Sequence, residues 1–251
     1  MSYFNLGTYW HGRLLTLQQY ADEGHGFLSE LLCLYPAFQT LSWVGDRPNS
    51  AVSISADLNN LADLIYDHAG SKRHLYEYAN ADGTPSWQST CIFGYSMRFS
   101  TGKPASAGGL SVSIRAGSTE SPIPNAVTIS FPDVEDPTFS HREFYSYKFL
   151  RDLFLSVIGF WKPERGLVTQ HAFSEAVSGD DLPYVGWFTY LRDPRAAALR
   201  NSVSLAGLEF ERAADGGTLI SLDRAIISPD NHLQLEKARR LRSKVIAERL
   251  V

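Results

Sequence analysis

The stretch from Glu143 to Trp161 constrains the fold of this chain more than any other feature. Apolar and aromatic side chains recur there at the spacing of one helix face, and further aromatic residues widen that face until the helix is apolar nearly all round. Its charged residues, Lys148, Arg151 and Asp152, argue against a membrane span. Pro163 cannot continue a helix. The pattern therefore predicts an aromatic helix buried within a globular domain.

Alternating apolar and polar runs predict β-strands on both sides of this helix. Three consecutive runs joined by short turns predict an antiparallel meander, and two runs around Asp215-Gly216-Gly217 predict a hairpin. The meander runs are 91–99, 110–114 and 126–131, the hairpin runs are 208–212 and 218–222, and the remaining strand candidates are 3–10, 40–44, 51–54, 167–170 and 186–191.

Helical periodicity also occurs outside the aromatic stretch. Residues 14–20 and 27–34 predict two short helices, interrupted by Gly24 and Gly26, and a further helix is centred on 58–65. Residues 233–250 predict a C-terminal amphipathic helix. The predicted fold class is therefore α+β, an antiparallel β-sheet with packed helices. No long linker interrupts residues 1–251, so we expect a single domain, with any division into two subdomains near 135–142.

Composition excludes disorder, since aromatic residues make up 12% of the chain and charged residues only 20%. The net charge of -4 disfavours a protein that binds nucleic acid as a whole. The charge is unevenly spread, because residues 1–223 carry 24 acids and 16 bases whereas residues 224–251 carry 3 acids and 7 bases. Two acidic loops are predicted within the acidic part, and they contain Asp133, Glu135, Asp136, Asp180 and Asp181.

The basic C-terminal helix has two interpretations. The simpler one is a solvated outer face, with Leu235, Ala238, Leu241 and Val245 packed inward. A basic helix can also indicate contact with nucleic acid or a membrane surface, and the alternative function is a nucleic-acid-binding adaptor that uses these bases.

The sequence contains no motif of a large enzyme class. It has no zinc pattern, no phosphate-binding glycine loop and no nucleophile elbow, so neither a metal nor a cofactor is predicted. A hydrolase whose triad is dispersed in sequence stays open as an alternative. Cys33 and Cys91 are predicted to be reduced, buried thiols. The start of the sequence lacks the features of a signal peptide, and we expect a soluble cytoplasmic protein.

Three stretches carry a family resemblance. They are FYSYKFLRDLFLSVIGFWKPERG at 144–166, VGWFTYL at 185–191 and GGTLI at 216–220. In this order they resemble the immunity protein 52 family of bacterial polymorphic toxin systems, most strongly over residues 140–225. The shared positions are aromatic packing positions, so the resemblance implies that Trp161 and Trp187 matter for the fold rather than for the binding surface.

The resemblance implies a function without catalysis. Members of this family are encoded beside toxins with a restriction-endonuclease-like nuclease domain, so it implies an immunity protein that binds and blocks a cognate type VI secretion nuclease toxin. The expected partner is that toxin, without direct contact to nucleic acid or membrane, and the protein alone is expected to be a monomer. The five acidic loop residues are the candidate toxin-binding residues, since a nuclease presents a positive surface to DNA phosphates.

Overall fold

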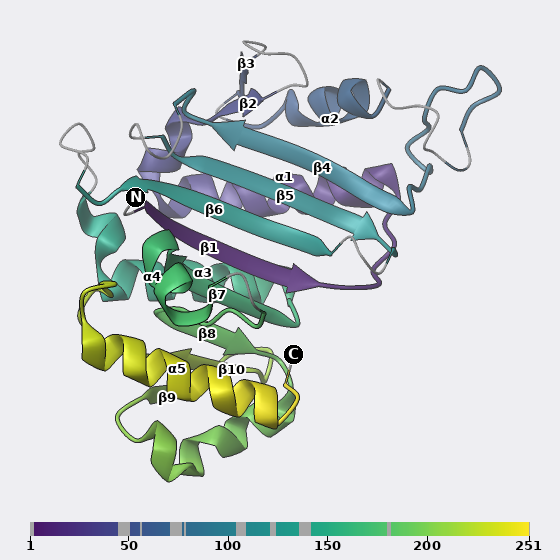
Figure 1. Cartoon of the computed structure of the whole chain (residues 1–251). Helices are drawn as coiled ribbons and strands as arrows, with labels where there is room; N and C mark the ends of the chain where they lie inside the picture. Colours follow the sequence, from purple (N-terminus) through teal and green to yellow (C-terminus); the bar gives the residue numbers. More distant parts are fainter. Residues whose placement is uncertain are drawn as a thin grey trace. The chain divides into compact units, whose positions relative to one another are not determined.

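The computed structural model describes residues 3–44, 51–55, 57–70, 77, 79–103, 109–120, 124–135, 142–179 and 182–250 (Figure 1). The chain forms two compact units. Unit 1 contains Met1–Tyr9, Ala105–Gly108 and Ser130–Val251, and unit 2 contains Trp10–Pro104 and Gly109–Ile129. The single domain over residues 1–251 stays a prediction.

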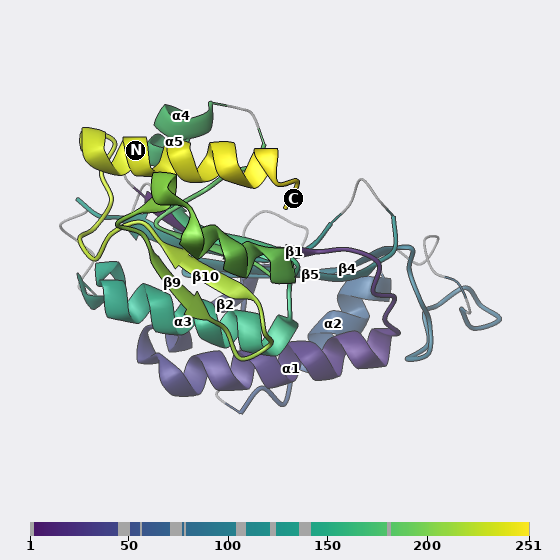
Figure 2. The ribbon, with the colours of Figure 1, turned by 90° about the horizontal axis from the view of Figure 1, so that it is seen from below.

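Unit 1 is built on antiparallel strands that lie in the order β1, β7, β8, β10, β9. Helix α3 covers one face of these strands, and α4 and α5 cover the other (Figure 2). The elements are β1 (Tyr3–Trp10), η4 (Arg142–Tyr145), α3 (Tyr147–Trp161), β7 (Arg165–Gln170), α4 (His171–Ser178), β8 (Phe188–Leu191), η5 (Pro194–Asn201), η6 (Val203–Leu205), β9 (Glu209–Arg212), β10 (Thr218–Ser221) and α5 (His232–Ala247).

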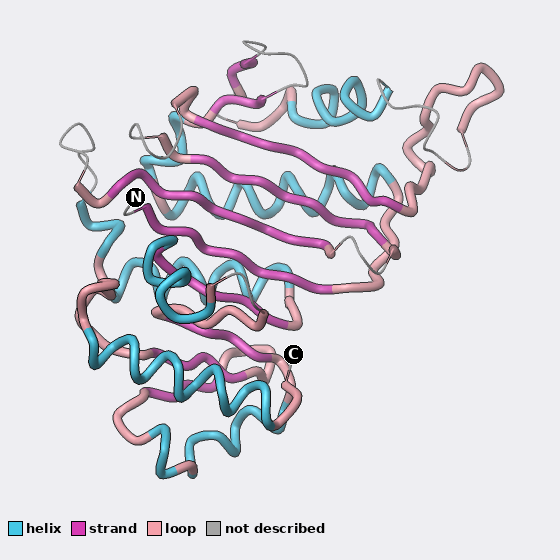
Figure 3. Tube along the Cα trace, in the orientation of Figure 1, coloured by secondary structure: helices cyan, strands magenta, loops and turns pink. Residues whose placement is uncertain are grey.

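Unit 2 contains the predicted meander. Strands β4, β5 and β6 are neighbours in sequence and in space, and β2 and β3 extend them beyond β4 (Figure 3). Helices α1 and α2 pack against each other, and the Tyr20 hydroxyl on α1 donates to the carbonyl oxygen of Ile114 on β5 at 2.9 Å. The elements are α1 (Leu17–Leu34), η1 (Pro36–Thr40), β2 (Ser42–Val44), β3 (Ala51–Ser53), α2 (Leu61–Gly70), β4 (Phe93–Ser100), β5 (Ser111–Ser118) and β6 (Asn125–Asp133), whose last residues belong to unit 1. Helices and antiparallel strands in both units confirm the α+β class.

The predicted interruption of the first helix is wrong. Helix α1 is continuous from Leu17 to Leu34 and passes through both Gly24 and Gly26. A Cβ at Gly24 would lie 2.6 Å from Cε of Met97 on β4, so this glycine permits close contact between helix and sheet. A capping box between Thr16 and Gln19 fixes the start of the helix. Packing therefore offsets the helix-weakening effect of glycine.

The aromatic helix forms as predicted but is enclosed less completely. Ser146 caps its start, and Lys162 ends it in the left-handed conformation just before Pro163. One face is buried against the sheet and includes Phe154 and Trp161, whereas Lys148 and Gly159 are exposed. The additional aromatic residues Phe149 and Phe160 are half-buried at the margins of that face.

The structure also shows the hairpin and how far the tryptophans and cysteines are buried. The β9–β10 hairpin is confirmed, with Thr218 opposite Arg212. Four of the five tryptophans are buried, and Trp87 is half-buried. Both cysteines are free, and Cys91 is buried, but Cys33 is exposed on the last turn of α1, which corrects its predicted burial. No helix among the described residues is long and apolar enough to cross a membrane.

Candidate functional site

The structure places two of the five predicted toxin-binding residues together. Asp133 ends β6, and Glu135 follows in a turn and is exposed. The backbone N–H of Glu135 donates to Oδ1 of Asp133 at 3.0 Å. Arg142 donates to the carbonyl oxygen of Val134 in the same turn, so a positive charge lies beside these two acids. The remaining three, Asp136, Asp180 and Asp181, lie outside the described residues.

Three basic residues of α5 form hydrogen bonds or ion pairs within the protein. Lys237 donates to the carbonyl oxygen of Leu222 and pairs with Asp223 at 3.3 Å. Arg239 donates to the carbonyl oxygen of Ala176 on α4, and Arg242 donates to the carbonyl oxygens of Leu182 and Pro183. The inward packing of Leu235, Ala238, Leu241 and Val245 is confirmed. These contacts favour the simpler interpretation, in which α5 is a solvated outer helix.

The edge strand β9 carries a network of charges that joins it to α3. Glu209 pairs with Arg224, whose guanidinium lies 5.4 Å from the ring centroid of Tyr147 on α3. The Tyr147 hydroxyl donates to Glu209, and burial raises the pKa of this tyrosine. Arg151 pairs with Glu211 one turn later on α3. Charged side chains on an edge strand discourage pairing with another chain, so this network protects the edge.

The hairpin motif is held by a buried tyrosine. The Tyr190 hydroxyl on β8 donates to Oδ2 of Asp215 at 2.5 Å, while Oδ1 of Asp215 accepts from the backbone N–H of Gly217 at 3.1 Å. A Cβ at Gly217 would overlap the Tyr190 hydroxyl, and Gly216 has a φ of 91°. Both glycines are therefore required by local packing and backbone conformation, which gives this family motif a structural role.

We expect the free energy of unfolding of the Tyr190→Phe variant to fall less at alkaline pH than that of the wild type. Burial, followed by the Asp215 carboxylate, raises the pKa of Tyr190 in the folded state above its ordinary value of 10.0. Because the folded protein keeps this proton while the unfolded chain loses it, the wild-type free energy of unfolding falls as pH rises above about 10. The variant loses the hydrogen bond, at about 1.5–3 kcal/mol near neutral pH. Urea unfolding at pH 8 and pH 11 should give it the shallower fall, and equal falls would contradict the prediction.

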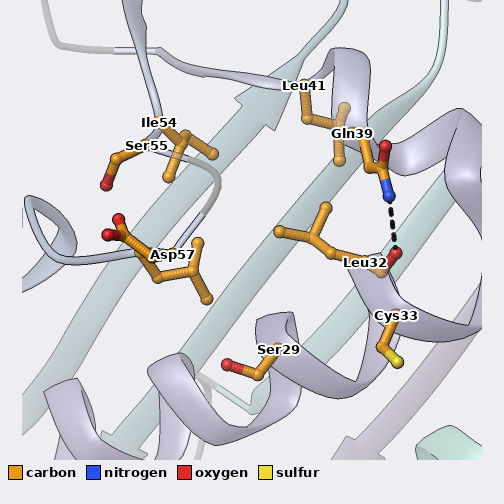
Figure 4. Close-up of a pocket in the computed structure, with 9 residues that line it drawn as sticks. Ser29, Leu32, Cys33, Gln39, Leu41, Ile54, Ser55 and Asp57 are labelled. Atoms are coloured by element: carbon orange, nitrogen blue, oxygen red, sulfur yellow. Dashed lines mark hydrogen bonds between the residues drawn. The ribbon is translucent and has the colours of Figure 1, made fainter.

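A pocket of about 500 Å³ lies within unit 2, between the end of α1, η1 and the segment from β3 to α2 (Figure 4). It is lined by Ser29, Leu32, Cys33, Gln39, Leu41, Ile54, Ser55, Asp57 and Leu58. The described lining residues offer hydroxyl, thiol and carboxylate groups but no histidine, so these residues do not assemble a hydrolase triad. No group of three or more His, Cys, Asp or Glu residues in the described part of the chain could hold a metal ion.

The pocket lies in a part of the chain whose described residues are acidic. Between residues 14 and 97, the described residues include eight acids and no Lys or Arg. The acids are Asp22, Glu23, Glu30, Asp57, Asp63, Asp67, Glu77 and Asp82, and all except Glu23 are exposed. The three bases of this stretch, Arg47, Lys72 and Arg73, lie outside the described residues. A charge count along the sequence in shorter windows is the signal that would have found this region.

Comparisons with known proteins agree with the resemblance in the sequence. The structure is similar to that of the Pseudomonas aeruginosa T6SS protein PA0821, with a TM-score of 0.56 and 14% identity over 96% of this chain and 74% of that chain. At this identity the similarity shows a shared fold. A search of curated proteins finds no match. The model of the family described as Immunity protein 52 matches residues 2–250. The chain therefore belongs to the immunity protein 52 family.

Proposed function

We propose that this protein binds a cognate type VI secretion nuclease toxin and blocks it, without catalysis of its own, in the cytoplasm of producer and sister cells. The observation that carries this proposal is the family match over residues 2–250. The structural similarity to a T6SS protein supports the link to type VI secretion. The nuclease target rests on the resemblance, because family members are encoded beside nuclease toxins.

The charge of the protein supports a nuclease as the target. A nuclease must present a positive surface to DNA phosphates, and an acidic inhibitor gains from opposite charge in the rate and selectivity of encounter. Residues 1–223 carry eight more acids than bases. The acidic loops with Asp133, Glu135, Asp136, Asp180 and Asp181 remain proposed contacts with the toxin.

Co-purification tests the proposed function. The tagged protein is co-expressed with the protein encoded by the adjacent gene, and a stable complex is expected on gel filtration. Adding the purified immunity protein to the purified toxin should stop DNA cleavage in vitro. A neighbour that is not toxic, or two proteins that do not bind, would overturn the proposal.

Charge reversal tests the first acidic loop. Changing Asp133, Glu135 and Asp136 to Lys should slow association with the toxin by about tenfold or more at low salt, because like charges then oppose the encounter. Stopped-flow fluorescence measures this rate, and circular dichroism checks the fold. An unchanged association rate in a folded variant would remove this loop from the interface.

A further inference from the structure

We infer that the pocket between α1, η1 and the β3–α2 segment receives a basic side chain of the toxin, an Arg or a Lys on a positively charged segment. This inference rests on the proposed function and adds a contact surface to it. The surface is the pocket itself, with Asp57 at its lining. It lies entirely within unit 2.

The walls of the pocket suit the stem of a long basic side chain. Figure 4 shows Leu32, Leu41 and Ile54 pointing into the space between α1 and the segment that carries Asp57. Ser29, Gln39 and Ser55 add polar groups around this apolar surface. Arg and Lys bury their methylene stems along apolar walls and keep the charged group near polar or charged partners. A volume of about 500 Å³ accommodates such a side chain.

Asp57 supplies the charge at the pocket. Its carboxylate is exposed and is held by the backbone N–H of Asn59 at 3.2 Å and by the side-chain amide of Asn59 at 2.5 Å. The hydrogen bond from the backbone of Asn59, followed by that from Ser55, lowers the pKa of Asp57. Both side-chain oxygens of Asp57 therefore accept hydrogen bonds from Asn59. No other lining residue among those the structure describes is charged.

The helices of unit 2 carry further exposed acids among their described residues. Asp22 and Glu30 are exposed on α1, and Asp63 and Asp67 are exposed on α2, which packs against α1. An acidic surface of this kind attracts a positive partner over several ångströms and raises its association rate. It also disfavours a second copy of this chain, because a two-fold interface would place the acidic surface against itself.

Cys33 provides a native reporter for this pocket. It lines the pocket and is exposed, whereas Cys91 is buried, so a maleimide applied to the folded protein should label Cys33 alone. The labelling rate is measured by mass spectrometry with and without the purified toxin nuclease domain from the adjacent gene. With free toxin at about ten times its Kd, labelling should slow about tenfold. A control protein with Cys33→Ser and Ser204→Cys, whose new thiol is exposed in unit 1, should label at one rate in both conditions.

A pair of matched substitutions tests the charge. Asp57→Asn should weaken toxin binding about tenfold, since it removes the one charge of the described lining residues, whereas Asp230→Asn, an exposed aspartate in unit 1, should leave it unchanged. Isothermal titration calorimetry gives both affinities.

The outcomes separate this inference from the proposed function. If wild-type protein and toxin show no binding by calorimetry, the proposed function fails. If they bind while Cys33 labels at its free rate, or while Asp57→Asn binds as tightly as wild type, the pocket inference fails and the proposed function stands. Slower labelling at higher protein concentration without toxin would overturn the inference in favour of a second copy.

Discussion

Replacing Trp187 with alanine is expected to lower the free energy of unfolding by about 3–5 kcal/mol. The ring is fully buried and lies 5.8 Å from the ring of Phe4 on β1 and 5.4 Å from that of Phe188. Its indole N–H donates to the carbonyl oxygen of Asp223 at 2.7 Å. The substitution leaves a large cavity and removes this donor, and both effects destabilise the folded state.

Urea unfolding followed by circular dichroism measures this loss, and two controls locate its cause. Trp187→Phe keeps most of the ring volume and should cost less than alanine. Trp87→Ala, at a half-buried position in unit 2, should also cost less. Trp187→Ala protein that remains folded should still bind the toxin, because the role of this residue is internal. A cost within 0.5 kcal/mol of zero, the usual range for surface positions, would contradict the prediction.

Local signals were strong enough to predict several elements of this fold. The β9–β10 hairpin was predictable because Asp215-Gly216-Gly217 supplies the turn that its two alternating strands require. Helix α3 was predictable because its apolar period is strong and Pro163 follows its end. Helix α5 was predictable from the spacing of its inward residues. In each case the deciding interactions lie close together in sequence.

The errors arose where distant residues decide the outcome. Gly24 was predicted to interrupt a helix, but it lies within the continuous helix α1. The absence of a side chain there lets the helix approach Met97 on β4. Cys33 read as buried because cysteine is usually buried, yet it lies on the open side of α1 beside the pocket. The pocket is lined by residues of α1 and of the β3–α2 segment, which are far apart in sequence. No local sequence pattern predicts that these two segments lie side by side.

Residues of the family motifs pack inside the protein. Trp161 and Trp187 are fully buried, and Gly217 leaves the space that the Tyr190 hydroxyl occupies. A toxin cannot reach such positions in the folded protein. Selection for a particular toxin would therefore act on exposed residues outside these motifs, such as those around the pocket. The described family motif residues Trp161, Trp187 and Gly217 are accordingly explained by packing inside the protein.

The same glycine-to-alanine change should have opposite effects at two positions of unit 1. At Gly186, within the family stretch before β8, a Cβ would overlap the backbone carbonyl oxygen of Val168 and lie 2.9 Å from Cβ of Thr169. Backbone of a central strand cannot move aside cheaply, so Gly186→Ala should cost about 3 kcal/mol or more. Gly159 on α3 is exposed and has no atom within 4 Å of its Cβ position, so Gly159→Ala should stabilise the helix by about 0.5–1 kcal/mol. Urea midpoints for the two variants should move in opposite directions, and a shift in the same direction would show that contact with Val168 does not govern this position.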